Sequence, residues 1–167
     1  VLMRIFSTTI ACAVALSTGA ATVTDTANAC TRVLWNDNGY AVMVGRTMDW
    51  PESTEPILTL FPRGLARNGG MAGKDVVVAD NPAKWTSKFG SVATTIYGIG
   101  TADGINEKGL GVHMLYLNAT DFGPRSPGKP GVQAGLWAQY VLDNAATVAE
   151  ALKLLEGVQI VMVEANG

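Results

Sequence analysis

The residue best suited to chemistry in this sequence is Cys30, which follows the stretch Ala27-Asn28-Ala29. Small residues at positions 27 and 29, behind an apolar segment with one positive side chain, Arg4, form the A-x-A pattern that signal peptidase cleaves. Cleavage would leave Cys30 as the first residue. Its thiol would then lie beside a free α-amine of similar ordinary pKa, which can take the thiol proton directly or through one water. The pattern predicts an N-terminal cysteine nucleophile that needs no histidine.

Cys30 has three other interpretations: a small buried hydrophobe, half of a disulfide, or a lipid anchor. The only other cysteine, Cys12, lies in the apolar core of the predicted signal peptide, so the exported chain would keep one cysteine and no internal disulfide. A lipoprotein signal usually has leucine three residues before the cysteine, where this chain has Ala27. We therefore favour an unpaired, reactive thiol.

A cation is predicted near this thiol. Two β-rich runs, 31–35 and 40–46, flank an Asn-Gly turn and predict a hairpin. With the turn centred near Asp37 and Asn38, Cys30 would lie opposite residues 45–47, and the guanidinium of Arg46 would favour the thiolate. The alternative for Arg46 is a solvated strand end.

Asp49 is a candidate partner of the terminal amine. On a regular strand it would face away from Arg46, but a bend at Asp49-Trp50-Pro51 could turn the carboxylate back toward the α-ammonium. Taken in isolation, Asp49 is an ordinary turn residue.

The single histidine, His113, lies between Val112 and Met114 in an apolar stretch. A Cys30–His113 dyad is one hypothesis, and a core or pocket-wall histidine is the commoner outcome. No cluster of His, Cys, Asp or Glu has the spacing of metal ligands, so we expect no metal site.

The elements that would hold these residues follow from the remaining pattern. We expect strands over 57–61, 76–79, 91–99 and 109–118, with loops or turns at 62–74, 103–108 and 121–131. A helix near 136–144 would have an apolar face of Leu136, Trp137, Tyr140 and Val141. A capping box, Thr147 to Glu150, would open a second helix with Val148, Ala151, Leu152 and Leu155 inward. Strands followed by helices predict an α+β domain.

Composition bounds the protein class. The chain has 167 residues, 48% hydrophobic and 16% charged, with a formal charge of −2, which fits one globular domain and offers no basic surface for nucleic acid. The apolar stretch 5–21 is interrupted by serine and threonine, which favours a signal peptide over a membrane span. We expect residues 1–29 to be removed and the product to be exported, periplasmic or secreted, without a membrane span.

Three motifs together resemble the choloylglycine hydrolase and penicillin V acylase family of N-terminal nucleophile hydrolases. They are Cys30-Thr31-Arg32, the run 45–50 (Gly-Arg-Thr-Met-Asp-Trp), and the run 104–110 leading into 113–116 (His-Met-Leu-Tyr). The resemblance implies a four-layer αββα sandwich, hydrolysis of linear amides without metal or cofactor, and a homo-oligomer.

The resemblance also implies roles for single residues. Cys30 matches the nucleophile, Arg46 the arginine beside it, and Asp49 the aspartate that contacts the terminal amine. Tyr116 falls at a position near the oxyanion where penicillin V acylases tend to have tyrosine. Trp50 resembles the branch in Gram-negative bacteria, which implies penicillin V or N-acyl homoserine lactones as substrates ahead of conjugated bile salts.

Length is the departure from the family pattern. Family members are roughly twice this size, and their second half supplies an oxyanion-hole asparagine and a further arginine. We therefore expect residues 30–167 to be the N-terminal part of a longer hydrolase domain, inactive by itself. The competing class is a lipidated or secreted binding domain without enzymatic activity.

Overall fold

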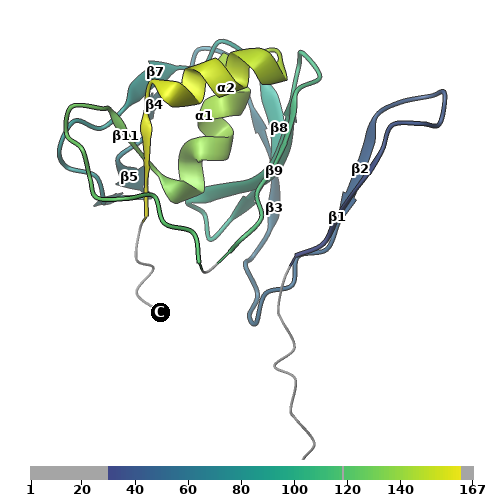
Figure 1. The fold of residues 1–167 in the computed structure, drawn as a ribbon, viewed down its shortest axis with the longest axis horizontal. Helices are drawn as coiled ribbons and strands as arrows, with labels where there is room; N and C mark the ends of the chain where they lie inside the picture. Colours follow the sequence, from purple (N-terminus) through teal and green to yellow (C-terminus); the bar gives the residue numbers. More distant parts are fainter. Residues whose placement is uncertain (1–29, 118, 163–167) are drawn as a thin grey trace, which may run out of the picture.

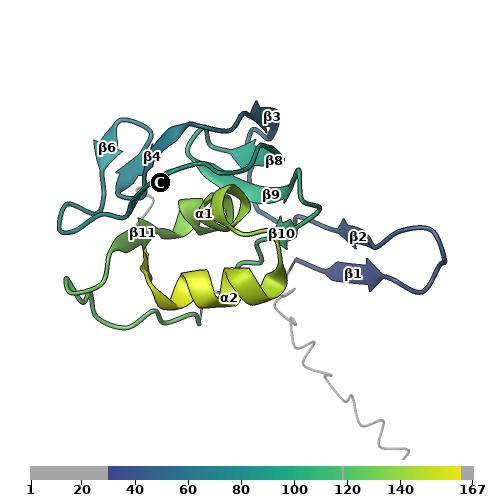
Figure 2. The ribbon, with the colours of Figure 1, turned by 90° about the horizontal axis from the view of Figure 1, so that it is seen from above.

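The centre of the fold is a four-stranded antiparallel sheet in the order β10-β9-β8-β3. The structure is a computed structural model that describes residues 30–117 and 119–162. Helix α1 packs on one face of the sheet, and α2 lies against α1 on the side away from the sheet (Figures 1 and 2). These elements are β3 (Ile57–Phe61), β8 (Ser91–Ile96), β9 (Gly100–Asn106), β10 (Gly111–His113), α1 (Trp137–Asn144) and α2 (Val148–Glu156).

The two faces of the sheet differ in burial. The face toward α1, called the helix face, carries Ala93 and Val112 in a core with Val141 and Leu142. The other face, called the open face, carries exposed side chains: Leu58 76%, Leu60 76%, Val92 38% and Ile105 52%. Alternation along the strands puts Asp103 and His113, which are register partners, on the open face as well.

Helix α1 has the predicted extent but a different environment. Besides the buried Val141, it buries the polar side chains of Gln139 and Asp143. Asp143 accepts hydrogen bonds from the Trp85 indole at 2.7 Å and from the Gln139 amide at 2.8 Å, and it pairs with Arg67 at 3.3 Å. The polar side of the helix is thus buried as well. Its burial is tolerated because the buried polar groups have hydrogen-bond partners.

Helix α2 begins at the predicted capping box. The Thr147 hydroxyl accepts from the Glu150 backbone at 3.2 Å, and the Glu150 carboxylate accepts from the Ala146 backbone at 2.8 Å. The predicted inward face is wrong in part. Ala151 is buried, but Val148 and Leu152 are 66% and 63% exposed, because α2 touches the core along a narrow stripe.

The predicted hairpin is present as β1 (Arg32–Trp35) and β2 (Met43–Arg46), and it projects from the rest of the fold (Figure 1). Its register differs from the expected one. Arg32 pairs with Arg46, which centres the loop on Gly39 at φ +70°, one to two residues later than predicted. The Asn38 side chain is the cause, since it accepts from the Tyr40 and Ala41 backbones and so builds a wider loop.

The predicted turn at 103–108 is wrong over its first four residues, which belong to β9. Strand β9 pairs with both β8 and β10, and the turns fall at Tyr97–Ile99 and after Asn106. Gly104 fits there because a Cβ would lie 2.7 Å from the Leu142 side chain of α1. The close contact between α1 and the sheet thus requires a glycine in β9. The sequence of this strand resembles a turn because of that glycine and its neighbours.

Shorter pairs flank this core. The stretch 62–74, predicted as loop, contains β4 (Ala66–Asn68) and β5 (Met71–Ala72), and the strand predicted at 76–79 is β6 (Asp75–Val76). The strands predicted to end at Ile99 and to span 109–118 are shorter, as β8 and β10. The remaining described elements were not predicted from the sequence: β7 (Lys84–Thr86), β11 (Gly131–Gln133), η1 (Ala134–Leu136) and β12 (Gln159–Val161). These elements are too short to produce a periodic pattern.

The α+β class is confirmed, and the described residues supply a helical layer and a sheet layer of the expected sandwich. The predicted signal peptide, residues 1–29, lies outside the described residues. Within residues 30–117 and 119–162, no helix has the length and apolar character needed to cross a bilayer.

Candidate active site

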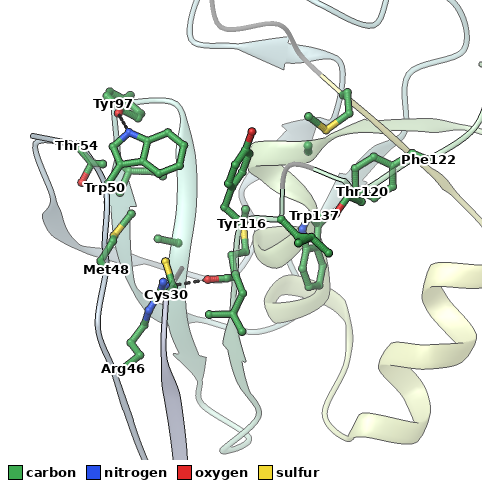
Figure 3. Close-up of a pocket in the computed structure, with 17 residues that line it drawn as sticks. Cys30, Arg46, Met48, Trp50, Thr54, Tyr97, Tyr116, Thr120, Phe122 and Trp137 are labelled. Atoms are coloured by element: carbon green, nitrogen blue, oxygen red, sulfur yellow. Dashed lines mark hydrogen bonds between the residues drawn. The ribbon is translucent and has the colours of Figure 1, made fainter. Parts of the chain in front are cut away.

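An apolar cavity of about 190 Å³ opens beside the hairpin, with Cys30 and Arg46 at one end of it (Figure 3). Aromatic and long aliphatic side chains form most of its wall, and Arg46 is the one charged residue among the described residues that line it. The larger wall residues are Met48, Trp50, Ile96, Tyr97, Met114, Leu115, Tyr116, Leu117, Phe122, Trp137 and Met162. Such a cavity suits an uncharged, apolar group.

Cys30 is a half-buried free thiol immediately before the hairpin ladder. The observed register pairs the Thr31 carbonyl with the Thr47 backbone N–H at 2.9 Å, which puts Cys30 beyond Thr47 and not opposite residues 45–47 as expected. The cysteine and Arg46 nevertheless both line the cavity.

Three hydrogen bonds fix the guanidinium of Arg46. Its Nε donates to the Thr47 carbonyl at 3.1 Å, and its Nη1 donates to the Met114 carbonyl at 2.8 Å and to Asp103 Oδ2 at 2.9 Å. Only 11% of the Arg46 side chain is exposed. The alternative of a solvated strand end is therefore wrong for Arg46.

Asp103 joins Arg46 to His113. Its Oδ2 faces Arg46, and its Oδ1 lies 2.9 Å from Nδ1 of His113. His113 is partly buried on the open face, and the residues that line the cavity do not include it. His113 therefore has a partner, but it lies neither in the core nor in the wall of the cavity, which were the two places expected for it.

Asp49 lies just after the end of β2, where the chain leaves the sheet as predicted. Its Oδ2 accepts from the Thr47 hydroxyl at 2.8 Å, and that hydroxyl in turn accepts from the Thr31 backbone N–H at 3.1 Å. The carboxylate is thus turned back toward the start of the hairpin, where Thr31 follows Cys30.

Trp50 and Tyr116 form an aromatic corner of the cavity. Their rings meet edge to face, with centroids 5.1 Å apart and an interplanar angle of 84°. The Trp50 indole also donates to the Tyr97 hydroxyl at 2.7 Å (Figure 3). Four of the five predicted site residues, Cys30, Arg46, Trp50 and Tyr116, therefore line one cavity, and Asp49 lies beside it.

Two residues of this site, Asp103 and Tyr97, were not predicted from the sequence. Asp103 lies in the stretch taken for a turn, and Tyr97 was placed inside a strand although its φ of +52° puts it in the β8–β9 turn. The Tyr97-Gly98 pair is a weak turn signal, and no local pattern links Asp103 to an arginine 57 residues earlier.

The geometry has a clear chemical meaning. A thiol and a fixed guanidinium line the same cavity, and a cysteine sulfur can act as a nucleophile. The apolar wall extends away from these two groups and offers space for a hydrophobic substituent. Nucleophilic attack on a carbonyl that carries such a substituent is the reaction the arrangement favours.

Comparison with known proteins agrees with this geometry. Residues 30–166 match the family described as linear amide C–N hydrolases, choloylglycine hydrolase family, so the match begins at Cys30. Penicillin V acylase of Pectobacterium atrosepticum is 40% identical over 144 residues, which cover 81% of this chain and 36% of that protein.

Two solved structures are similar in fold. Penicillin V acylase from Agrobacterium tumefaciens superposes with a TM-score of 0.67 at 41% identity, covering 78% of this chain and 39% of that one. A mutant form of conjugated bile acid hydrolase from Clostridium perfringens gives a TM-score of 0.58 at 22% identity, covering 79% and 39%.

The chain spans between a third and two fifths of the length of these relatives. The family match nevertheless covers most of this chain and begins at Cys30, the residue predicted as a nucleophile. This chain belongs to the choloylglycine hydrolase family of linear amide C–N hydrolases.

Proposed function

We propose that the protein is an exported cysteine amidase that hydrolyses a linear amide through an acyl-enzyme on Cys30. The observation that carries the proposal is the position of Cys30, which begins the family match and shares an apolar cavity with a fixed arginine. In this proposal residues 1–29 are a signal peptide, and their removal frees the α-amine of Cys30.

The reaction has two steps. The α-amine takes the thiol proton, Sγ bonds to the amide carbonyl carbon, and the C–N bond breaks as the leaving amine takes that proton. The acyl group is then held as a thioester. Water attacks the thioester carbon, the S–C bond breaks, and the acid is released while the thiol recovers a proton.

Arg46 and Asp49 set the charge of the nucleophile in this proposal. Arg46 lowers the cost of the thiolate through its positive charge. Asp49 is assigned to the α-ammonium, and its link through Thr47 to the Thr31 backbone supports that assignment because it aims the carboxylate at the start of the hairpin.

The substrate class follows from the cavity wall. Trp50 and Tyr116 would contact the acyl group, with Tyr116 also near the oxyanion. A cavity of about 190 Å³ with an aromatic corner suits an aryl or alkyl acyl chain. We therefore propose acyl amides of the penicillin V or N-acyl homoserine lactone type as substrates, ahead of conjugated bile salts.

The family resemblance and the proposed signal peptide extend the proposal to a homo-oligomeric enzyme that is periplasmic or secreted.

Two alternatives make different predictions. In a Cys30–His113 hydrolase the histidine is the base, although the bond from His113 Nδ1 to Asp103 and its place outside the cavity favour the terminal amine. In a lipidated or secreted binding domain Cys30 carries a diacylglycerol or is inert.

The test combines mass and activity of the full-length gene product expressed with its leader. An intact mass that begins at unmodified Cys30, together with release of phenoxyacetic acid from penicillin V, would support the amidase. Cys30→Ser should slow hydrolysis by several orders of magnitude, because an amine of ordinary pKa deprotonates a hydroxyl far less readily than a thiol. A diacylglycerol adduct on Cys30, or full activity of Cys30→Ser, would refute the proposal.

A further inference from the structure

We propose that Asp103 is a positioning residue that holds the guanidinium of Arg46 beside Cys30. The inference rests on the proposed function, because it assigns Asp103 to the same nucleophile. It adds a residue that acts through Arg46, without contact with the substrate.

The first step concerns charge. The Arg46 side chain is only 11% exposed, and a buried charge is costly unless it is paired and hydrogen-bonded. Two of its three recorded bonds go to the neutral carbonyls of Thr47 and Met114. Asp103 Oδ2, at 2.9 Å, supplies the opposite charge.

The second step concerns rigidity. Asp103 lies in β9 and has Thr94 of β8 and His113 of β10 as register partners, so the sheet fixes its backbone on both sides. His113 also fixes its Oδ1. The residues of β1 and of β2 other than Arg46 are exposed, so Arg46 depends on the sheet for its place.

The third step concerns direction. Arg46 donates through Nε and Nη1 in its three hydrogen bonds to Thr47, Met114 and Asp103. None of these three bonds uses Nη2. The carboxylate therefore holds Nη1, the atom that also donates to the carbonyl of Met114, and fixes the guanidinium at the cavity that Cys30 lines. Reactive groups held by such a supporting contact keep a productive geometry.

The experiment compares Asp103→Asn with Asp103→Ala in the full-length, processed protein. Both variants lose the carboxylate charge, which by itself would favour the thiolate. Asparagine keeps an oxygen that accepts from Arg46, and alanine does not. The difference between the two variants thus isolates positioning from charge.

Two measurements are made on each folded variant. The first is the rate of Cys30 alkylation by iodoacetamide at neutral pH, located by peptide mass. The rate for Asp103→Ala should be about tenfold below that for Asp103→Asn, because the sulfur loses its nearby cation. The second is amide hydrolysis, where kcat for Asp103→Ala should be about tenfold or more below that for Asp103→Asn. KM should change little, since the apolar wall binds the acyl group.

Glu107→Gln is the matched control, because Glu107 pairs with Arg63 close to β9 but the pair lies outside the residues that line the cavity. It should leave the alkylation rate unchanged. Asp103→Val, which also lacks an acceptor, replaces the alanine variant if that one fails to fold. Equal alkylation rates for the folded Ala (or Val) and Asn variants would overturn the positioning role. A slower rate for the Ala variant in a protein without amidase activity would support positioning and refute the proposed function.

Discussion

The indole N–H of Trp50 donates a 2.7 Å hydrogen bond to the hydroxyl of Tyr97, a residue with φ of +52°. The Tyr97 backbone N–H donates to the Thr54 carbonyl at 2.9 Å, and its hydroxyl donates to Glu52 at 3.2 Å. A positive φ is unfavourable for tyrosine, and such strain persists where the surroundings enforce it, often at functional sites. The turn between β8 and β9 therefore orients the aromatic wall of the cavity.

Tyr97→Phe should weaken substrate binding. Loss of the Trp50 hydrogen bond should raise KM by about two- to tenfold with a smaller change in kcat, since a net hydrogen bond contributes about 0.5–1.5 kcal/mol. Burial raises the pKa of the Tyr97 phenol, the Trp50 bond opposes the rise, and Glu52 adds to it. The phenol thus stays protonated at neutral pH, and the KM effect should not vary across the neutral range. Tyr40→Phe, at a 94% exposed tip of the hairpin, is the control.

His113→Ala should keep most of the activity. The change removes one of the two side-chain partners that Asp103 has among the described residues, while Arg46 keeps its bonds to Asp103 and to two carbonyls. We expect a loss of less than about tenfold in kcat/KM, the effect of one hydrogen bond. A loss as large as that of Cys30→Ser would show that a Cys-His hydrolase, and not the terminal amine, performs the reaction.

Gly104→Ala should destabilise the protein. The new methyl group would lie 2.7 Å from the Leu142 side chain, which is fully buried between α1 and the sheet. Overpacking of this kind costs about 1–3 kcal/mol, measurable by denaturant unfolding. Gly128→Ala, where an added Cβ meets no atom within 4 Å, should leave the free energy of unfolding nearly unchanged. Equal stability of the two variants would contradict the helix–sheet contact.

Glu107→Gln should alter the pH dependence of stability. The hydrogen bond from Arg63, with help from the Gly90 backbone, lowers the pKa of Glu107 below its ordinary value of 4.5. A carboxyl group whose pKa is lowered in the folded state stabilises the fold at pH values above its ordinary pKa. This contribution is lost as the pH falls through the folded-state pKa. The melting temperature of the variant should therefore lie below that of the wild type at neutral pH, and the gap should close under acid. High salt should narrow the gap at neutral pH because the pair is exposed.

The sequence predicted the elements with strong periodicity or a specific end signal. Helix α1 and the capping box of α2 are confirmed because apolar spacing and the Thr147–Glu150 pair are local properties of the chain. Strand β9 was missed because Asp103 and Gly104 resemble a turn. They belong to a strand because Leu142, from a helix much later in the chain, occupies the space above Gly104.

The candidate active site could likewise be predicted from the sequence only in part. Cys30 and Arg46 could be paired from the hairpin and the family resemblance, and the structure brings them to one cavity. Their register could not be predicted, because the Asn38 side chain widens the loop. Asp103 could not be found either, since its role depends on a contact between the hairpin and a distant strand.

The bond between Arg46 and Asp103 joins residues 57 positions apart, whereas the hairpin bond between Thr31 and Thr47 spans 16. Local contacts form early in folding, and distant ones wait until the intervening chain has been ordered. The hairpin that follows Cys30 can therefore pair before Asp103 fixes Arg46. If Cys30 is the nucleophile proposed above, it gains its supporting cation late in folding, and this order would limit thiol chemistry on the half-folded chain.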